Sequence, residues 1–134
     1  DDLHSDANRA KMASGNPLTD ADRLPWLCTV ATAIRETEAE WVVATCSALR
    51  RRYRDLIRSK AGCPVVFVYL AGDSSTIAER LALRQGHFMP PSLLASQLAT
   101  LERPGADEPH VTVNIGEHME TILDRLCRDL RALE

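Results

Sequence analysis

The sequence lacks the glycine spacing that a Walker-type loop requires. Its six glycines include no two that are five residues apart, so the motif G-x-x-x-x-G-K-[ST] does not occur in these 134 residues. Long hydrophobic runs are also missing. The longest, residues 65–71, is too short to cross a bilayer, and no signal peptide opens the sequence. These absences predict a cytoplasmic protein that makes no contact with a membrane.

Cysteine pairs and an excess of positive charge are absent as well. The four cysteines include no C-x-x-C pair, and we interpret them as reduced thiols packed in apolar surroundings. With 16 basic and 19 acidic side chains the net charge is −3, which argues against nucleic-acid binding. The length and the ordinary composition indicate one domain, residues 1–134, that can bury a core without disulfide bonds.

Hydrophobic periodicity predicts several helices. Thr19 and Asp22 form a capping-box pattern that predicts a short helix, and Pro25 suits the first turn of the next one. Either Ser74 or Ser75 can cap a helix that ends near residue 85. Apolar residues at helical spacing predict the other helices over residues 25–38, 49–60, 92–101 and 117–133.

Three short apolar runs predict buried strands over residues 41–46, 65–70 and 111–115. Strands that are apolar on both faces and alternate with helices form parallel sheets, so the expected fold class is α/β. Ligands of such sheets bind beyond the carboxyl ends of the strands. We therefore expect a ligand site within residues 47–54, 72–75 and 114–118.

Two pairs of arginines are spaced four residues apart, which places each pair on one helical face. Arg50 and Arg54 follow the first expected strand, where a helix start favours anions, and both anion binding and a solvated face remain open. Arg80 and Arg84 precede residues 86–91, where a glycine and two prolines predict a hinged lid. The alternative for this second pair is favourable charge at a helix C-terminus.

The first six residues combine three carboxylates with one imidazole. Asp1, Asp2, Asp6 and His4 match no zinc or EF-hand spacing, so a metal site made only of protein ligands is not expected. A carboxylate that binds a hydroxyl or accepts its proton is the open functional interpretation. An acidic first turn without any such role is the alternative.

Four segments resemble the signature motifs of bacterial-type gluconokinases. They occur in the family's order and extend across nearly the whole sequence, which makes the resemblance specific. They read D-D-L-H at residues 1–4 with N-x-x-K-M-x-x-G-x-P-L-x-D-x-D-R-x-P-W-L at residues 8–27, C-S-A-L-R-x-x-Y-R-D at residues 46–55, R-L-x-x-R-x-G-H-F-M at residues 80–89, and L-E-x-P-G-A-D-E at residues 101–108.

The resemblance implies a P-loop NTPase-type fold, related to shikimate and adenylate kinases, with three α/β/α layers and a parallel sheet of strand order 2-3-1-4-5. It also implies that the γ-phosphoryl group of ATP is transferred to the 6-hydroxyl of D-gluconate with Mg²⁺, giving 6-phospho-D-gluconate. Because relatives are commonly dimers, a homodimer is expected. Arginines, Mg²⁺ and a closing lid suit this chemistry, since phosphoryl transfer depends on positioning and charge neutralisation.

The resemblance further implies roles for individual residues. Residues 1–24 would form a substrate-binding flap, and Asp1 would bind a substrate hydroxyl and accept its proton. Residues 84–92 would form a lid, with Arg84 on the phosphates as a catalytic residue. Arg80, Asn114 and Gly116 would hold the adenine side of ATP. The other substrate contacts would come from Asp2, His4, Arg23, Arg50, Arg54 and His87, and no residue is assigned to Mg²⁺.

The sequence departs from the family at its start. Relatives carry strand 1, the Gly-rich loop and strand 2 before the position of Asp1, and these are absent here. Because strand 1 lies inside the family's sheet, we expect the natural protein to be longer and a chain of only these residues to have no kinase activity. Two alternatives remain: a shikimate-kinase-like enzyme with another hydroxy-acid acceptor, and a non-catalytic fragment that binds a sugar acid.

Overall fold

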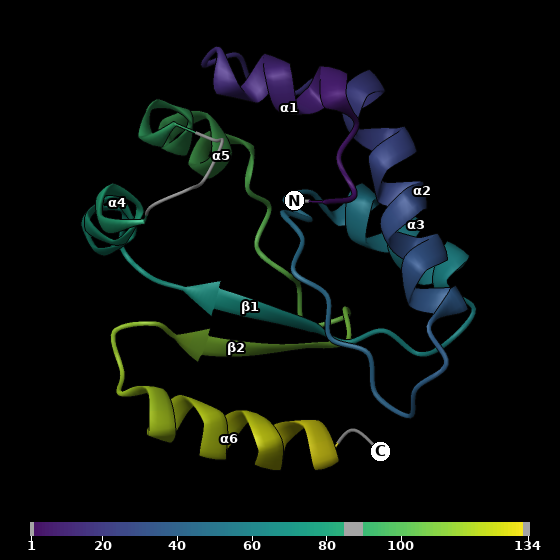
Figure 1. Cartoon of the computed structure of the whole chain (residues 1–134). Coiled ribbons are helices and arrows are strands. Elements are labelled where there is room, and N and C mark those ends of the chain that lie inside the picture. Colours follow the sequence, from purple (N-terminus) through teal and green to yellow (C-terminus); the bar gives the residue numbers. More distant parts are fainter. Residues whose placement is uncertain (1, 85–89, 133–134) are drawn as a thin grey trace.

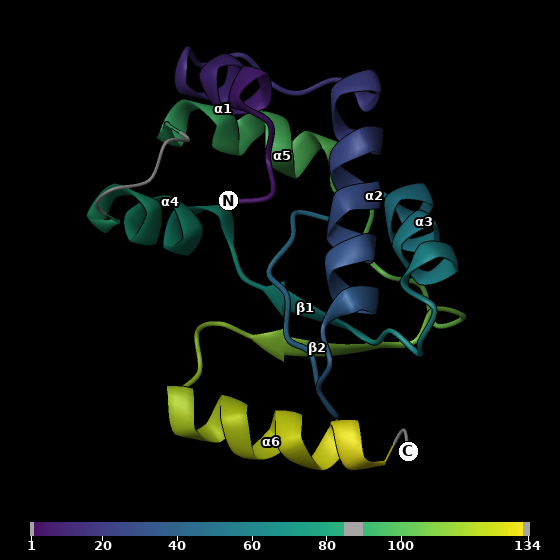
Figure 2. The ribbon, with the colours of Figure 1, turned by 45° about the vertical axis from the view of Figure 1, so that its right-hand side comes forward.

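The chain places helices on both sides of a small parallel sheet (Figures 1 and 2). The structure is a computed structural model and describes residues 2–84 and 90–132. In chain order the elements are α1 (Asp6–Ala13), α2 (Asp20–Glu36), α3 (Arg51–Ala61), β1 (Phe67–Ala71), α4 (Ser74–Leu83), the 3₁₀ helix η1 (Pro91–Leu93), α5 (Leu94–Thr100), β2 (His110–Asn114) and α6 (Met119–Arg131). α2 and α3 lie side by side on one side of the strands and α6 lies on the other, which confirms the α/β class.

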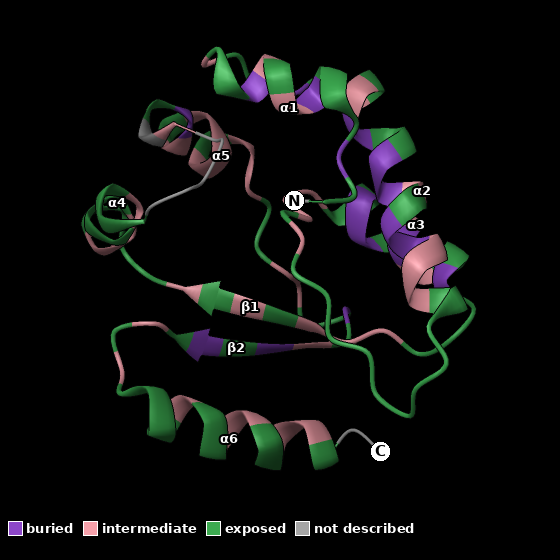
Figure 3. Cartoon of the chain, in the orientation of Figure 1, coloured by how far each residue is buried: buried purple, intermediate pink, exposed green. Residues whose placement is uncertain are grey.

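The core lies between α2 and α3, where Figure 3 shows many of the buried residues. Leu27, Val30 and Ala31 of α2 pack in one cluster with Tyr53 and Ile57 of α3, and each is at most 3% exposed. These residues recur every three or four positions, so each helix presents one apolar stripe to the other. Removing such stripes from water is the main stabilising contribution of the pair. The helices predicted from apolar residues at helical spacing over residues 25–38 and 49–60 are confirmed here, with those residues packed inward.

β1 and β2 pair in parallel, with Phe67 opposite His110. Side chains alternate between the two faces of a strand, so Val111 and Val113 lie on the face opposite to Phe67. Phe67 packs against the α2–α3 core, whereas α6 contacts β2. The expected strands over residues 65–70 and 111–115 are confirmed within about two residues, and their pairing agrees with neighbouring strands 4 and 5 in the order 2-3-1-4-5.

Residues 41–46 do not form the strand that their sequence predicts. No described strand pairs with them, and Trp41 and Val43 are 60% and 94% exposed. A strand is stabilised by hydrogen bonds to its neighbours. In the order 2-3-1-4-5 this segment would lie between strands 2 and 1, and neither occurs in this sequence. The strand prediction is therefore wrong here, because apolar composition without a pairing partner does not make a strand.

The helices between residues 6 and 36 differ from the predicted ones. The capping box of Thr19 and Asp22 is present, but it begins the single long helix α2, and Pro25 lies inside that helix. Pro25 removes one main-chain hydrogen bond, and packing of the buried face of α2 offsets the loss. α1 was not predicted from the sequence; Ser5 caps it by accepting a hydrogen bond from the N–H of Asn8 at 3.1 Å.

The remaining helices follow the expected order with local differences. Neither Ser74 nor Ser75 caps α4, because the carboxylate of Asp73 accepts a hydrogen bond from the N–H of Thr76 at 2.8 Å. The segment expected as one helix over residues 92–101 is divided into η1 and α5. Within the described ranges, none of the helices combines the length and the apolar character needed to span a membrane.

Candidate active site

Three arginines and one acid meet where the starts of α2 and α3 approach each other. Asp20 accepts hydrogen bonds from the Tyr53 hydroxyl and from Arg52, and Nη1 of Arg50 lies 4.0 Å from Oδ2 of Asp20. The Tyr53 bond, followed by the arginines, lowers the pKa of Asp20, so its carboxylate is ionised. Arg23 lies over the Tyr53 ring, with its guanidinium carbon 5.9 Å from the ring centre. Arg23, Arg50 and Arg52 are called the arginine cluster below.

Arg23 is buried, and among the described residues it has no carboxylate within ion-pair distance. It is 3% exposed, and its Nε donates a hydrogen bond to the Leu18 carbonyl at 3.3 Å. Burial lowers the pKa of Arg23, Tyr53 and Asp20 oppose this shift, and the nearby charge of Arg50 adds to it. Nε of Arg50 is also buried, with no hydrogen-bond partner in the described part of the chain. Because a buried positive charge is costly without a counter-charge, Arg23, together with the partly exposed Arg50, suits an anionic ligand.

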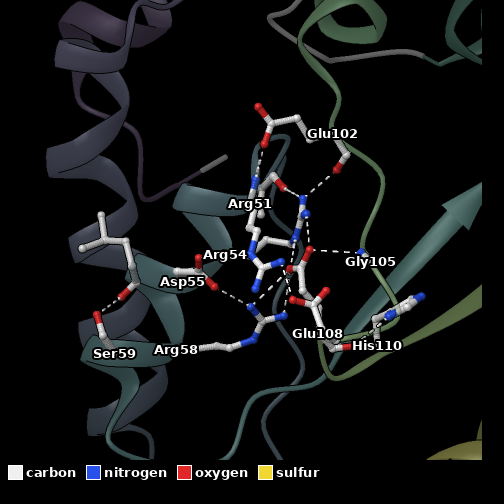
Figure 4. Close-up of polar contacts among 12 residues, drawn as sticks. Arg51, Arg54, Asp55, Arg58, Ser59, Glu102, Gly105, Glu108 and His110 are labelled. Atoms are coloured by element: carbon white, nitrogen blue, oxygen red, sulfur yellow. Dashed lines mark hydrogen bonds and ion pairs between the residues drawn. The ribbon is translucent and has the colours of Figure 1, made fainter.

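Arg54, which was expected to contact substrate, forms an interior ion pair instead (Figure 4). Its Nε and Nη2 donate to the two carboxylate oxygens of Glu108 at 2.7 and 2.8 Å, and Nη1 donates to the Glu102 carbonyl at 2.9 Å. The Arg54 hydrogen bonds lower the pKa of Glu108 to about 2. The Arg54 side chain is 3% exposed and its donors face the protein, so we correct the expectation. Helical spacing placed Arg54 beside Arg50 without revealing its acidic partner.

The loop formed by residues 101–108 holds the start of α3. A carboxylate oxygen of Glu102 accepts a hydrogen bond from the N–H of Arg51 at 2.8 Å, and Glu102 N–H donates to the Leu49 carbonyl at the same distance. Asp107 accepts a further bond from the Arg51 side chain at 2.6 Å. The helix start that was expected to favour an external anion therefore already carries an internal carboxylate. The motif at residues 101–108 therefore stabilises the start of α3.

His4 stacks on Trp26, with ring centres 4.0 Å apart and an angle of 16° between the ring planes. Burial is the largest cause that lowers the pKa of His4 to about 4, so its imidazole is neutral at pH 7. Both rings line a pocket of about 440 Å³, to which Ser5, Asn8 and Asp22 add polar groups. A pocket of this size with an aromatic wall and several polar groups suits a small ligand with hydroxyl groups.

The residues expected near the adenine come together at the carboxyl ends of β1 and β2. Nη2 of Arg80 donates to the Ile115 carbonyl at 2.7 Å, and the Asn114 side chain accepts a hydrogen bond from Gly116 N–H at 2.9 Å. Gly72 follows β1 and lies against the same loop, because a Cβ there would be 2.5 Å from the side chain of Ile115. Arg80, Asn114 and Gly116 therefore lie within one small region, as ligand sites of parallel sheets require.

The other expected site residues lie either outside the described part of the chain or on its surface. Asp1 and His87 lie outside the described residues. Asp2 is exposed, and Arg84 is an exposed residue at the C-terminal end of α4. Within residues 2–84 and 90–132, no group of three or more His, Cys, Asp or Glu side chains could hold a metal ion. The described residues therefore provide no protein cage for Mg²⁺, which commonly takes water and phosphate oxygens as ligands.

Sequence reasoning missed two acids that organise the region, Asp20 and Glu108. Asp20 lies within the motif at residues 8–27, where the resemblance drew attention to Arg23 alone. Glu108 ends an acidic motif, and its complement is the run of arginines at residues 50–58. The only available signal was this match of opposite charges, and it does not specify which pair becomes buried.

Comparison with known proteins assigns the family, although no protein-family model matches the chain. The chain is 47% identical to a gluconokinase of Gluconobacter oxydans, covering 98% of this chain and 75% of that protein. It is 42% identical to the thermosensitive gluconokinase of Escherichia coli, covering 96% and 69%. The crystal structure of a gluconokinase from Sinorhizobium meliloti is similar with a TM-score of 0.79 and 41% identity, covering 99% of this chain and 79% of that one. A sugar kinase from Janibacter superposes with a TM-score of 0.86 at 41% identity, covering 97% and 76%. The chain therefore belongs to the gluconokinase family and has the fold of the P-loop kinases.

Proposed function

We propose that this chain acts in the ATP-dependent phosphorylation of D-gluconate to 6-phospho-D-gluconate. The observation that carries the proposal is the buried guanidinium of Arg23 beside Arg50, without a carboxylate partner of its own in the described chain. Gluconate brings one carboxylate, and a guanidinium can bind both of its oxygens. The gluconokinases of Gluconobacter oxydans and Sinorhizobium meliloti, as relatives over almost the whole chain, support the same acceptor.

The hydroxyl groups of gluconate are proposed to lie toward the first residues of the chain. The pocket beside His4 and Trp26 offers an aromatic wall and polar groups, and Asp2 is close in sequence. Neutral His4 can exchange hydrogen bonds with a hydroxyl without adding charge. In the transfer step the 6-hydroxyl oxygen bonds to the γ-phosphorus of ATP as the bond to the bridging oxygen breaks, and ADP leaves. Asp1, outside the described residues, is the proposed acceptor of the hydroxyl proton.

The adenine side of ATP is proposed to lie beside the loop that follows β2. Arg80 fixes this loop through the Ile115 carbonyl, and Asn114 closes its turn. Arg84 is proposed to contact the phosphates and His87 the substrate, from the lid at residues 84–92. Bound Mg²⁺ would neutralise phosphate charge, and no step is assigned to it here because the described residues offer no cluster to hold it.

The test is a coupled assay of ADP release by the natural full-length protein with D-gluconate or shikimate as the acceptor, together with calorimetric titration of both acids. Gluconate-dependent ADP release supports the proposal. Release with shikimate alone would transfer the assignment to the shikimate-kinase-like alternative. D-sorbitol has similar hydroxyls but no carboxylate, so it should neither bind nor react. Binding of sorbitol as tight as that of gluconate would contradict the role of the arginine cluster.

Gluconate binding with no ADP release in this assay would contradict phosphoryl transfer while keeping the arginine cluster as a sugar-acid site. The absence of both binding and ADP release would overturn the whole proposal.

We also propose that the protein is a cytoplasmic homodimer that contacts neither nucleic acid nor membranes. The four cysteines are free thiols in the structure, as the cytosol favours. The net charge of −3 gives no general attraction to phosphate backbones. Sedimentation of the purified chain tests the dimer.

A further inference from the structure

Asp20 is the acid that pairs with the arginine cluster in the described chain. Its carboxylate is bonded by Tyr53 and Arg52 and lies 4.0 Å from Nη1 of Arg50. Arg23, Arg50 and Arg52 together carry three positive charges, and Asp20 supplies the one negative charge paired with them in the described chain. The three arginines and Asp20 therefore have a net charge of +2 before any ligand binds.

The contacts of Asp20 are directed away from its own helix. Asp22, two residues later, completes the capping box of α2 by accepting hydrogen bonds from the N–H and hydroxyl of Thr19, both at 2.7 Å. Capping of α2 therefore does not require Asp20. The carboxylate of Asp20 instead contacts the side chains of Arg52 and Tyr53 on α3, and the Tyr53 ring also contacts the buried Arg23.

The carboxylate of Asp20 can also be replaced easily at Arg50 and Arg52. The side chains of Asp20, Arg50 and Arg52 are 41%, 37% and 55% exposed. Ion pairs with this exposure are weak, because water screens the charges and can replace either partner. Arg23, by contrast, is buried and holds its position. A carboxylate that enters from solvent can therefore take over Arg50 while Arg23 stays in place.

We propose that Asp20 is a resident counter-ion that competes with the carboxylate of the sugar acid for the arginine cluster, and that it thereby sets the affinity for gluconate. The inference rests on the proposed function, because it assigns the arginine cluster to the substrate carboxylate. In the free protein Asp20 keeps Arg50 and Arg52 partly neutralised. When gluconate binds, its carboxylate replaces the carboxylate of Asp20 at Arg50. Asp20, which Tyr53 holds near Arg50 in the free protein, then no longer competes with the ligand.

The test is calorimetric titration of D-gluconate into Asp20→Asn at constant ionic strength. Asparagine keeps an acceptor for Tyr53 but removes the competing charge, so the dissociation constant should fall roughly tenfold, equivalent to about 1.4 kcal/mol. Asp55→Asn is the matched control. Asp55 is a half-exposed acid of α3 paired with Arg51 and Arg58, and its loss changes the net charge equally without touching the cluster. Gluconate affinity of this control should stay within about twofold of the unmodified chain.

Tyr53→Phe provides a second variant should Asp20→Asn fold poorly. It removes only the hydroxyl that anchors Asp20, and it should tighten gluconate binding by a smaller factor. Unchanged or weaker gluconate binding in Asp20→Asn, or in Tyr53→Phe where the first variant does not fold, overturns the competition while leaving the proposed function intact. Equal gains in Asp20→Asn and Asp55→Asn would also overturn it, because they would reflect net charge alone. Failure of the unmodified chain to bind gluconate would overturn the proposed function itself.

Discussion

The carboxylate of Glu108 accepts two parallel hydrogen bonds from the guanidinium of Arg54, at 2.7 Å from Nε and 2.8 Å from Nη2. Arg58 donates two further bonds to the same carboxylate, at 3.2 Å each. The pair joins α3 to the loop that leads into β2, two segments more than 40 residues apart in the sequence. It thus connects the helix start that carries Arg50 with the strand that ends at the expected adenine loop.

Removing one member of this buried pair should destabilise the protein strongly. Arg54→Met leaves the Glu108 charge buried with less compensation, and Glu108→Leu leaves the Arg54 charge buried without its carboxylate, so each should cost about 3 to 5 kcal/mol. The double variant Arg54→Met with Glu108→Leu should recover much of that loss, because neither charge of the buried pair remains and Arg58 keeps its ion pair with Asp55. Urea unfolding of the four proteins measures the cycle. Additive losses in the double variant would contradict the view that the two residues act as a pair.

Much of the fold was predictable because it depends on local pattern. The apolar stripes of α2 and α3 and the two apolar strands follow from residue spacing alone, and the structure confirms them. The segment at residues 41–46 has an equally strong strand pattern but pairs with nothing described. The spacing of apolar residues indicates which side of a segment is buried. Strand pairing, however, depends on a second segment elsewhere in the chain.

The site was less predictable, because charge alone does not reveal a partner. Arg23, Arg50 and Arg54 look alike in the sequence, yet Arg54 faces Glu108 while Arg23 is buried without an acid in the described chain. The difference arises from the 101–108 loop, which tertiary packing brings onto α3. Asp20 was overlooked for the same reason, since its contacts lie about 30 residues further along the chain.

His4 should make stability depend on pH between about 4 and 6.5. The folded protein lowers the pKa of His4 to about 4, whereas the unfolded chain protonates it near 6.5. The unfolded state therefore binds more protons in this range, and stability falls as the pH is lowered through it. His4→Phe keeps a ring against Trp26 but cannot titrate, so its melting temperature should lose this part of the pH dependence. Parallel curves of melting temperature against pH for both proteins would show that His4 is not the cause.

Arg80 should support nucleotide binding by fixing the loop after β2. Arg80→Met keeps the length of the side chain but loses the hydrogen bond to the Ile115 carbonyl, so the loop becomes more mobile. ADP affinity, measured by calorimetry, should fall roughly three- to tenfold, in keeping with the loss of one partly exposed charged hydrogen bond. Arg128→Met, an exposed change on α6, removes the same charge elsewhere and should leave ADP affinity unchanged. An equal fall in both variants would assign the effect to net charge.

Gly72 should be required because the turn after β1 passes directly against Ile115. A Cβ at this position would lie 2.5 Å from Cγ1 and Cδ1 of Ile115, and the N–H of Ile115 is tied to the Ala71 carbonyl at 2.8 Å. Gly72→Ala should therefore cost about 1 to 3 kcal/mol, typical of overpacking.

The clash involves one side chain, so shortening that side chain should relieve it. Ile115→Ala alone should destabilise by removing apolar contacts, but it should make Gly72→Ala much less harmful in the double variant. Because contacting residues couple whereas independent ones add within about 0.5 kcal/mol, denaturant unfolding of the single and double variants distinguishes the two cases. Strict additivity would mean that the loss in Gly72→Ala arises from the backbone and not from Ile115.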